Sequence, residues 1–147
     1  MQAVVESIHI APRKKEPTQP VERALAVPGR GLEGDRYFNR KKRPGPYGGV
    51  HDLTLIDAGA AEAIGLEPGD ARRNVVVRGI DLDALVGRRF RIGSVECLGH
   101  DLAHPCRRLE RLTRPGVLRG LAGRGGLYAG IVSGGEIAVG DPVEALG

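Results

Sequence analysis

A cysteine that directly follows a proline, between histidine and arginine residues, carries the clearest chemical signal in this chain. The segment reads His104-Pro105-Cys106-Arg107-Arg108. Proline is favoured at the first position of a helix, so we expect Cys106 in a first helical turn, where unpaired backbone N–H groups stabilise an anion. The thiolate that results is the nucleophilic and metal-ligating form of cysteine. The pattern therefore predicts a catalytic or metal-ligating Cys106. The simpler alternative is a small buried apolar residue.

The cations near Cys106 strengthen the first interpretation. Arg107 and Arg108 follow it directly, and His100 and His104 are further candidates. Positive charges of this kind, together with a helix N-terminus, lower the pKa of a thiol. The sequence therefore predicts a thiol at Cys106 that ionises more readily than a free cysteine.

The second cysteine, Cys97, has a different pattern. It shares strand parity with Val95, which predicts a side chain that points into the core. An alternative joins Cys97, His100, His104 and Cys106 in one zinc site, because all four residues are possible zinc ligands. Structural zinc sites usually join two separated pairs of ligands, and a single short segment fits that pattern poorly.

Arg72, Arg73 and Asn74 precede a predicted strand that is rich in valine. Their side chains should therefore lie at the mouth of the strands, where barrels commonly hold ligands. Arginine offers a forked donor that suits phosphate, and asparagine can both donate and accept hydrogen bonds. The segment predicts part of an anion site.

Two glycine-containing segments offer further cations. Arg36 ends the segment Gly31–Arg36, whose glycines suit a tight turn next to the charged pair Asp35–Arg36. The simpler interpretation of that pair is a turn with an ion pair on the surface. Arg124 lies in the cluster Gly123–Gly126, whose backbone N–H groups could face an anion. We take Arg36 and Arg124 as additional candidates for binding the phosphate of a cofactor.

The formal net charge of +4 favours anionic ligands without naming one. The most basic stretch, residues 36–43, precedes a Pro- and Gly-rich segment and is typical of a solvated surface loop; the alternative is a lid that reaches a phosphate. A function of a different class is a basic β-barrel that binds RNA and has no catalytic role. It explains the charge but not the cysteine, and with 3% aromatic residues the chain offers few surfaces for base stacking.

Length and composition restrict the class of protein. At 147 residues we expect a single domain over residues 1–147, large enough to have its own core. The two cysteines lack the spacing of a disulfide framework, and no apolar run approaches the roughly 18 residues of a membrane span. Glu6 and His9 interrupt any signal-peptide core. We therefore expect a cytoplasmic protein that does not interact with membranes.

The elements that must position these residues are mostly short strands. Hydrophobic alternation predicts strands over 3–10, 21–27, 52–56, 74–78, 89–92, 95–98, 127–133, 136–139 and 142–145. Helical segments are predicted over 58–66, 81–85, 105–112 and 117–123. Many short strands with few helices between them predict a mainly β protein, a closed β-barrel with a few short peripheral helices.

Five segments, taken in order, resemble one family. They are GLEGDRY (31–37), HDLTLID (51–57), RRNVVVRGIDLDALVGRRFRIG (72–93), HPCRRLE (104–110) and GRGGLYAGIVSGGEIAVGDPV (123–143). The chain resembles a small stand-alone MOSC domain, the module named for the C-terminus of molybdenum-cofactor sulfurases. The resemblance implies a β-barrel of the pyruvate-kinase-barrel type with one functional cysteine, which matches Cys106.

The resemblance also implies two kinds of chemistry. In some members of the family the matching cysteine is proposed to carry sulfur as a persulfide received from a pyridoxal-phosphate-dependent desulfurase. In the amidoxime-reducing members it ligates molybdenum in a bound pterin cofactor, and an Arg-Asn pair there matches Arg73 and Asn74. Many small relatives have a second cysteine three positions before the functional one. That position is Ala103 here, which excludes a local dithiol shuttle.

The sequence therefore predicts a MOSC-domain protein that uses Cys106 to bind molybdenum cofactor or to carry transferable sulfur. Reduction of N-hydroxylated compounds is the redox variant. Arg73, Asn74, Arg36 and Arg124 are the expected cofactor-binding residues, and the cofactor (molybdopterin) could be lost on purification. The expected partners are a cysteine desulfurase or an electron-donor protein and a small-molecule substrate, and no nucleic acid is expected.

Overall fold

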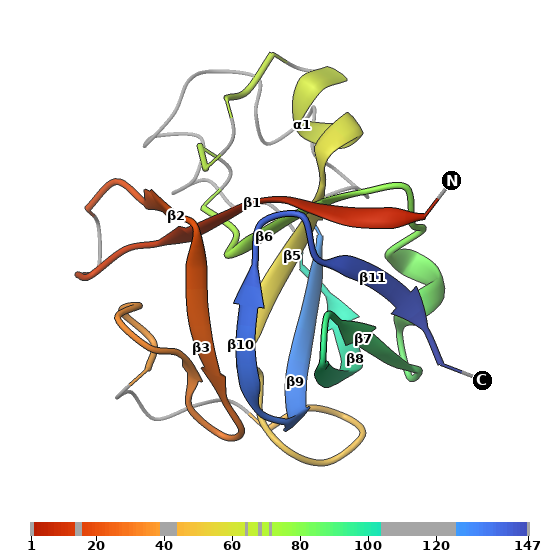
Figure 1. The fold of residues 1–147 in the computed structure, drawn as a ribbon. Coiled ribbons are helices and arrows are strands. Elements are labelled where there is room, and N and C mark those ends of the chain that lie inside the picture. Colours follow the sequence, from red (N-terminus) through yellow and green to blue (C-terminus); the bar gives the residue numbers. More distant parts are fainter. Residues whose placement is uncertain are drawn as a thin grey trace.

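Short β-strands are the main regular elements of this computed structural model (Figure 1). It describes residues 2–13, 16–38, 44–63, 65–67, 69–70, 72–103 and 126–146. The strands are β1 (Ala3–Ile10), β2 (Gln19–Val21), β3 (Arg23–Val27), β4 (Gly31–Leu32), β5 (Leu53–Asp57), β6 (Val75–Arg78), β7 (Arg89–Ile92), β8 (Val95–Leu102), β9 (Leu127–Ser133), β10 (Gly135–Ala138) and β11 (Pro142–Ala145). Within this part of the chain there is one α-helix, α1 (Ala58–Ala63), and one 3-10 turn, η1 (Asp83–Leu85).

Seven of the described strands close into a barrel. The order β11-β7-β8-β9-β5-β6-β1 returns to its start because β1 also pairs with β11, through Ala3↔Val143 and Val4↔Pro142. β2 extends the sheet beyond β1, and β10, β3 and β4 form a second, three-stranded sheet. The predicted fold class, a mainly β protein with a closed barrel, is therefore confirmed.

The neighbouring strands β5 and β6 run parallel, and α1 connects them. An Asp57 side-chain oxygen accepts a hydrogen bond from the Ala60 N–H at 3.1 Å, which satisfies one of the unpaired donors at the start of the helix. Alanines of α1 pack with Ile56 and Val76 in a small cluster outside the barrel. This crossover makes β5 and β6 begin at the same end of the barrel.

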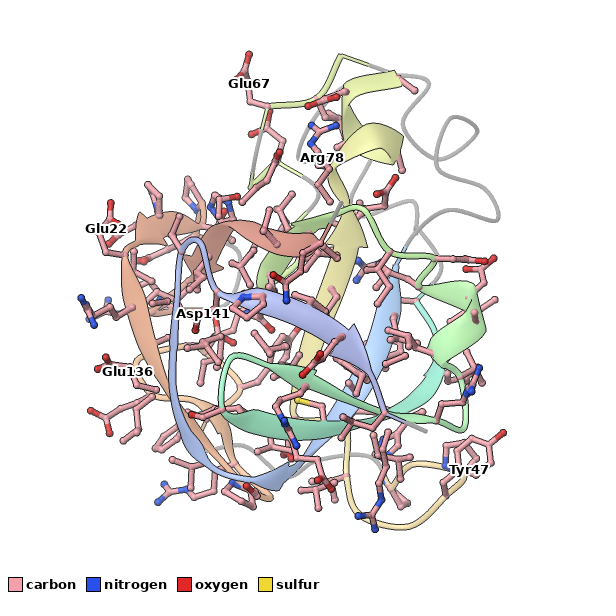
Figure 2. All side chains as sticks on the ribbon, turned by 45° about the vertical axis from the view of Figure 1, so that its right-hand side comes forward. Glu22, Tyr47, Glu67, Arg78, Glu136 and Asp141 are labelled. Atoms are coloured by element: carbon pink, nitrogen blue, oxygen red, sulfur yellow. The ribbon has the colours of Figure 1, made fainter. Side chains whose placement is uncertain are left out.

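Aliphatic side chains fill the barrel interior. The main cluster of buried residues combines alternate residues of the barrel strands, with Phe90, Leu55 and Ile8 among the largest. Charged side chains such as Glu22, Glu67 and Glu136 project outward from the ribbon (Figure 2). The alternation seen in the sequence thus separates an apolar interior from a charged exterior.

Two predicted strands differ from the structure by more than one residue at an end. The segment predicted as one strand over 21–27 divides at Glu22, because β2 pairs with β1 whereas β3 pairs with β10 in the second sheet. The strand predicted over 95–98 continues to Leu102 through a bulge at Gly99. A Cβ at Gly99 would lie 2.0 Å from the Leu85 carbonyl oxygen, so only glycine lets β8 pass this close to η1. The helices predicted over 105–112 and 117–123 lie outside the described residues.

The prediction for Cys97 is confirmed, because its side chain is fully buried in the barrel core. Within the described residues, no helix has the length and apolar character required to cross a membrane.

A substitution of Cys97 tests this packing. We expect Cys97→Ser to lower the free energy of unfolding by about 1–3 kcal/mol, because it places a hydroxyl in an apolar site. Urea denaturation measures the effect. Cys97→Ala, which removes the sulfur without adding a polar group, is the matched control and should cost less. Equal stability of the wild type and Cys97→Ser would show that the site is open to water.

Candidate functional site

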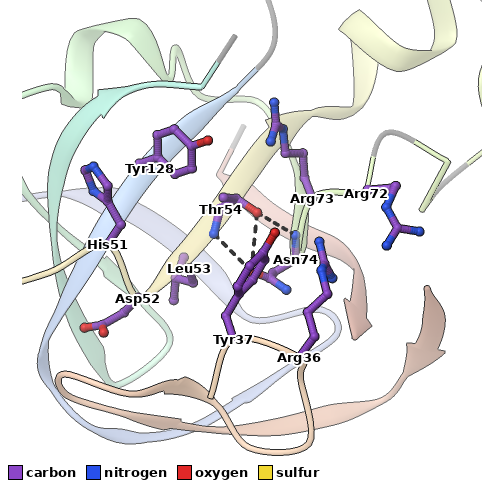
Figure 3. Close-up of a pocket in the computed structure, with 10 residues that line it drawn as sticks. All are labelled: Arg36, Tyr37, His51, Asp52, Leu53, Thr54, Arg72, Arg73, Asn74 and Tyr128. Carbon is purple, nitrogen blue, oxygen red and sulfur yellow. Dashed lines mark hydrogen bonds between the residues drawn. The ribbon is translucent and has the colours of Figure 1, made fainter. Parts of the chain in front are cut away.

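A cavity of about 240 Å³ lies at the end of the barrel where β5 and β6 begin. Its lining comes from the loop after β4, from β5 with the residues before it, from the segment before β6, and from β9 (Figure 3). We call it the arginine pocket, and its lining residues are Arg36, Tyr37, His51, Asp52, Leu53, Thr54, Arg72, Arg73, Asn74 and Tyr128. It brings together segments that are far apart in the sequence.

Asn74 and Thr54 form the floor of the arginine pocket. The Asn74 side-chain oxygen accepts hydrogen bonds from the Thr54 N–H (3.1 Å) and hydroxyl (3.3 Å), and the same hydroxyl accepts the Asn74 backbone N–H at 3.0 Å. The Asn74 side-chain amide also donates to the His9 carbonyl at 3.2 Å, and the His9 N–H donates to the Asn74 carbonyl at 2.7 Å. One buried amide therefore holds the ends of β1, β5 and β6 together.

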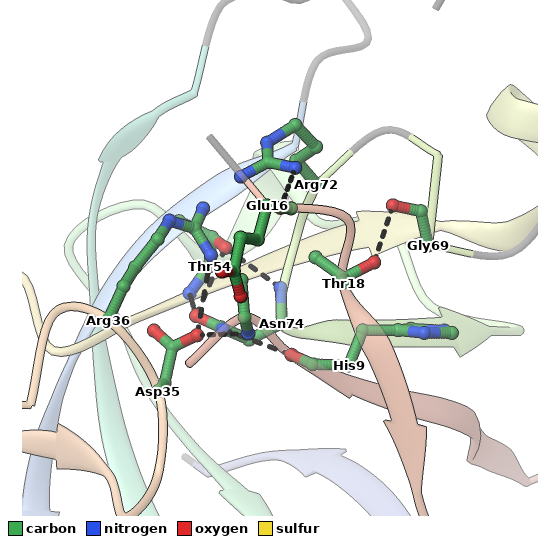
Figure 4. Close-up of polar contacts among 10 residues, drawn as sticks. His9, Glu16, Thr18, Asp35, Arg36, Thr54, Gly69, Arg72 and Asn74 are labelled. Atoms are coloured by element: carbon green, nitrogen blue, oxygen red, sulfur yellow. Dashed lines mark hydrogen bonds and ion pairs between the residues drawn. The ribbon is translucent and has the colours of Figure 1, made fainter. Parts of the chain in front are cut away.

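Two arginines precede this amide in the chain and line the same pocket. Arg72 has a φ of 59°, a left-handed conformation that residues other than glycine rarely adopt. Its guanidinium donates to the Glu16 carbonyl at 2.5 Å (Figure 4). Its backbone N–H donates to the Gly69 carbonyl at 2.9 Å. These bonds hold the unusual backbone turn that places Arg73 at the pocket, and unfavourable conformations of this kind gather at functional sites.

Arg36 reaches the arginine pocket from the loop after β4, and the structure corrects the interpretation of the Asp35–Arg36 pair as a surface feature. The two side chains are only 3% and 8% exposed and form an ion pair at 3.3 Å. The same Asp35 oxygen accepts the Ala11 N–H at 2.9 Å, and the Arg36 N–H donates to the Ala11 carbonyl at 2.7 Å. The loop is therefore fastened to the end of β1.

Two histidines meet at the opposite side of the arginine pocket. Their Nδ1 atoms, of His51 and His100, are 3.1 Å apart, within hydrogen-bond distance. The His51 ring also stacks on Tyr128, with 4.7 Å between ring centroids and 22° between planes. His51 lines the arginine pocket, whereas His100 is buried behind it and lines a second cavity of about 470 Å³.

Burial decides the charge of His100. Loss of solvent lowers its pKa from the ordinary histidine value, although Asp52 and a backbone hydrogen bond with Gly48 act in the opposite direction. His100 is therefore neutral at pH 7, so it is not one of the cations that the sequence suggested near Cys106. Asp52 itself accepts the Gly29 and Ile131 N–H groups at 3.1 and 2.8 Å.

Burial also determines the chemistry of Cys97. It raises the pKa of Cys97 to about 12, with smaller contributions from Asp52 and Glu96. The thiolate, which is the metal-ligating form, is therefore disfavoured at this position. No group of three or more possible metal ligands occurs within the described part of the chain.

The structure brings Arg36, Arg73 and Asn74 together, three of the residues that the sequence predicted as cofactor-binding. Cys106 and Arg124, together with His104, lie outside the described residues. Sequence analysis did not assign a role in the pocket to His51, Thr54 or Tyr128. One sequence signal could have indicated His51: the polar pair His51-Asp52 stands directly before a predicted strand. Polar residues at the mouth of a strand are well placed to contact a ligand.

The model of the MOSC domain family matches residues 54–144. The chain belongs to the MOSC domain family. The match covers Arg73, Asn74 and the position of Cys106, whereas Arg36 and His51 precede it. No curated protein matches this MOSC domain at a significant level.

Several solved structures have a similar fold. The MOSC domain is similar to the YuaD protein of Bacillus subtilis, with a TM-score of 0.80 and 22% identity over 99% of this chain and 96% of that one. It is also similar to YiiM from Geobacillus stearothermophilus, with a TM-score of 0.73 and 14% identity over 99% of this chain and 75% of that one. For YiiM from Escherichia coli the TM-score is 0.71, with 15% identity over 100% of this chain and 70% of that one. At these identities the likeness is one of fold.

A substitution of Asp35 tests the buried ion pair. We expect Asp35→Ala to lower the free energy of unfolding by about 3–5 kcal/mol, because it leaves the Arg36 guanidinium buried without its carboxylate. Chemical denaturation provides the measurement. Glu33→Ala removes the same charge from an exposed position of the same loop and should change stability by less than roughly 0.5 kcal/mol. Similar losses in both variants would contradict a specific role for the pair.

Proposed function

We propose that this MOSC domain binds molybdenum cofactor, or carries sulfur as a persulfide, with Cys106 as the functional thiol. Reduction of N-hydroxylated compounds is the redox variant of this function. The observation that carries the proposal is the arginine pocket, because its lining includes Tyr128, which pairs with Asp101 near the end of the strand that leads to Cys106.

The charges of the arginine pocket support binding of a phosphate-bearing group. Arg36, Arg72 and Arg73 contribute three guanidinium groups. Asp35 offsets the charge of Arg36 through their ion pair, and Asp52 is the single carboxylate in the lining and accepts backbone N–H groups. Arginine binds phosphate through charge-assisted hydrogen bonds with forked geometry. Arg73 and Arg36 would hold the phosphate of the cofactor, and Asn74 would keep Arg73 in place through its hydrogen bonds to neighbouring strands.

Chain connectivity links Cys106 to this pocket. β8 pairs with β9 through Asp101↔Tyr128 and Leu102↔Leu127, and the Ala103 N–H then donates to the Gly126 carbonyl at 2.8 Å. Tyr128 lines the arginine pocket. Cys106 follows Ala103 by three residues, which span at most roughly 11 Å. We infer from this connection that Cys106 acts on a group bound in the pocket.

A thiolate suits both forms of the proposed function, because it is a soft ligand for molybdenum and a good acceptor of sulfane sulfur. When bound, the molybdenum centre supplies oxidation and reduction of a substrate. In the sulfur-carrying form, the Cys106 thiolate attacks the outer sulfur of a persulfide on the donor protein. The donor S–S bond breaks, and its cysteine leaves as a thiolate that takes up the proton lost by Cys106. The donor would be a cysteine desulfurase, and the redox form would need an electron-donor protein.

The described surface favours this proposal over RNA binding. Several of its exposed arginines are paired with carboxylates, in Arg23–Glu136, Arg78–Glu6 and Arg89–Glu96. Such pairs reduce the attraction for a polyanion. Binding to mixed RNA with a steep dependence on salt would instead support the alternative function.

The most direct test is analysis of protein purified from a molybdenum-replete host. We expect molybdenum and pterin fluorescence with the wild type, or a persulfide on Cys106 after incubation with a cysteine desulfurase and cysteine. Cys106→Ser should abolish either signal while the unfolding transition stays unchanged. Neither signal in the wild type would overturn the proposal.

The role of Arg73 generates a separate prediction. Arg73→Ala should weaken binding of a phosphate-bearing cofactor by about 1.5–3 kcal/mol, because it removes a charge-assisted contact. Calorimetric titration measures the affinity. Arg91→Ala is the matched control, since Arg91 lies on β7 and pairs with Glu144 outside the pocket. If both variants weaken binding equally, net charge rather than the pocket attracts the anion.

The two thiols should differ in reactivity. We expect iodoacetamide to alkylate Cys106 much faster than Cys97, whose pKa is raised to about 12 by burial. The rate at Cys106 should follow a midpoint below about pH 7.5 if neighbouring cations stabilise the thiolate. Mass spectrometry of the alkylated peptides measures both rates. A midpoint at or above about 8.5, the value of a free thiol, would remove the activation of Cys106.

A further inference from the structure

The second cavity, of about 470 Å³, has walls of a different character from those of the arginine pocket. It lies between residues 28–29, the loop 47–50, Asp52 and strands β8 and β9. Its lining side chains are mostly apolar or aromatic, with Tyr47, Leu98 and Val132 among them. Its volume falls in the range of sites that hold small molecules, about 300–1,000 Å³.

The second cavity and the arginine pocket are neighbours. Asp52 lines both of them. His51 lines the arginine pocket, and its Nδ1 lies 3.1 Å from that of His100, which lines the second cavity. Asp52 and the two histidine rings therefore form a shared wall. Molecules bound in the two cavities would lie on either side of this wall.

Two β-bulges contribute residues to the second cavity. The register of β8 and β9 shifts twice, which leaves His100 as the extra residue on β8 in one bulge and Val132 as the extra residue on β9 in the other. Both residues line the second cavity. Bulges change the direction of side chains and are over-represented next to active sites. The pairing of β8 with β9 thus departs from regular alternation twice at the same cavity.

The loop over the second cavity is held by packing. Its Gly45 N–H donates to the Gly49 carbonyl at 2.9 Å, and a Cβ at Gly45 would lie 2.3 Å from Nδ1 of His100. On the other side of the loop, a Cβ at Gly87 would lie 3.0 Å from Cζ of Tyr47. The loop is therefore packed against the barrel at both places, so the cavity has defined walls.

The electrostatic character of the second cavity favours an uncharged ligand. Among its described lining residues Asp52 is the one charged side chain, whereas the arginine pocket has three guanidinium groups. The Asp52 carboxylate repels an anion. The largely apolar walls do not replace the hydration that an ion of either sign would lose on binding. His100 is neutral at pH 7, so it adds a polar group without a charge.

We propose that the second cavity binds an uncharged small molecule, with the apolar body of that molecule against Tyr47, Leu98 and Val132. Burial of apolar surface against these side chains would drive binding. Under the proposed function this molecule is the substrate, held beside the group in the arginine pocket. The inference rests on the proposed function for that role alone, because binding in the second cavity requires neither cofactor nor sulfur.

Three probes of similar shape test the preference for an uncharged ligand. Benzamide is neutral, benzoate is an anion and benzamidinium is a cation at pH 7. In ¹H–¹⁵N NMR titrations, we expect benzamide to shift the amide signals of Gly48, Gly130 and Val132, which line the second cavity. Both ions should affect these signals with an affinity at least about tenfold weaker, because a charged group loses hydration there. No shift with benzamide, or equally tight binding of either ion at these signals, would overturn the proposal.

A substitution at one bulge tests the location. Val132 is 42% exposed, so we expect Val132→Asp to fold, and its carboxylate should weaken benzamide binding at least about tenfold. Val139→Asp is the matched control, since Val139 is 39% exposed and is not among the described lining residues. It should change the affinity by less than about twofold, because a distant exposed charge is screened. Equal losses in the two variants would contradict binding in this cavity. The comparison of the three probes in the wild type decides the proposal even if Val132→Asp does not fold.

The result for the second cavity is distinguishable from the result for the proposed function. If no cofactor or persulfide is ever found but benzamide binds with the expected selectivity, the proposed function fails and the binding site stands. If cofactor or persulfide is found but benzamide does not bind, the inference about the second cavity fails alone.

Discussion

Closure of the barrel is the constraint on which the remaining structure depends. The first and last described strands, β1 and β11, pair through Ala3↔Val143 and Val4↔Pro142. The turn before β11 adds two backbone hydrogen bonds, from the Val5 N–H to the Asp141 carbonyl and from the Gly140 N–H to the Val5 carbonyl. An open sheet would expose two unpaired edges and one face of its aliphatic core to water. Because closure pairs these edges and encloses the core, polar side chains from distant segments are forced to gather at the barrel ends.

At one of these ends, polar groups are buried and must find partners. Asn74 meets this requirement by bonding Thr54 and the backbone of His9, and Asp35 does so by bonding Ala11 and Arg36. An unsatisfied buried polar group costs about 1–3 kcal/mol, so these contacts restrict where the neighbouring chain can lie. The position of the cationic pocket is thus a consequence of how the barrel end satisfies its hydrogen bonds.

Burial also separates residues of the same type by their chemistry. Cys97 lies in the apolar core and its raised pKa keeps it a thiol, so the proposed thiol chemistry depends on Cys106. Among the histidines, His100 is kept neutral inside the fold, whereas His51 reaches the pocket. The low polarity of the barrel interior therefore restricts reactive chemistry to residues at its end.

The sequence by itself determined the fold class and the boundaries of several strands. β1, β7, β9 and β11 lie where alternation predicted them, since a strand with one face in a barrel core must alternate. The inward direction of Cys97 followed from the same parity. Arg73 and Asn74 were recognised because a polar segment before a buried strand has to lie at its mouth.

Only the tertiary structure decided which distant residues meet. The division of 21–27 into β2 and β3 depends on two different pairing strands, and the burial of the Asp35–Arg36 pair depends on Ala11 at the end of β1. The contact between His51 and His100 requires both barrel closure and glycine at positions 45 and 130. Local periodicity reports which face of an element is buried, but it carries no information about which element covers that face. That choice is made by long-range packing, and at this barrel end it brings the arginines and the paired histidines together around one pocket.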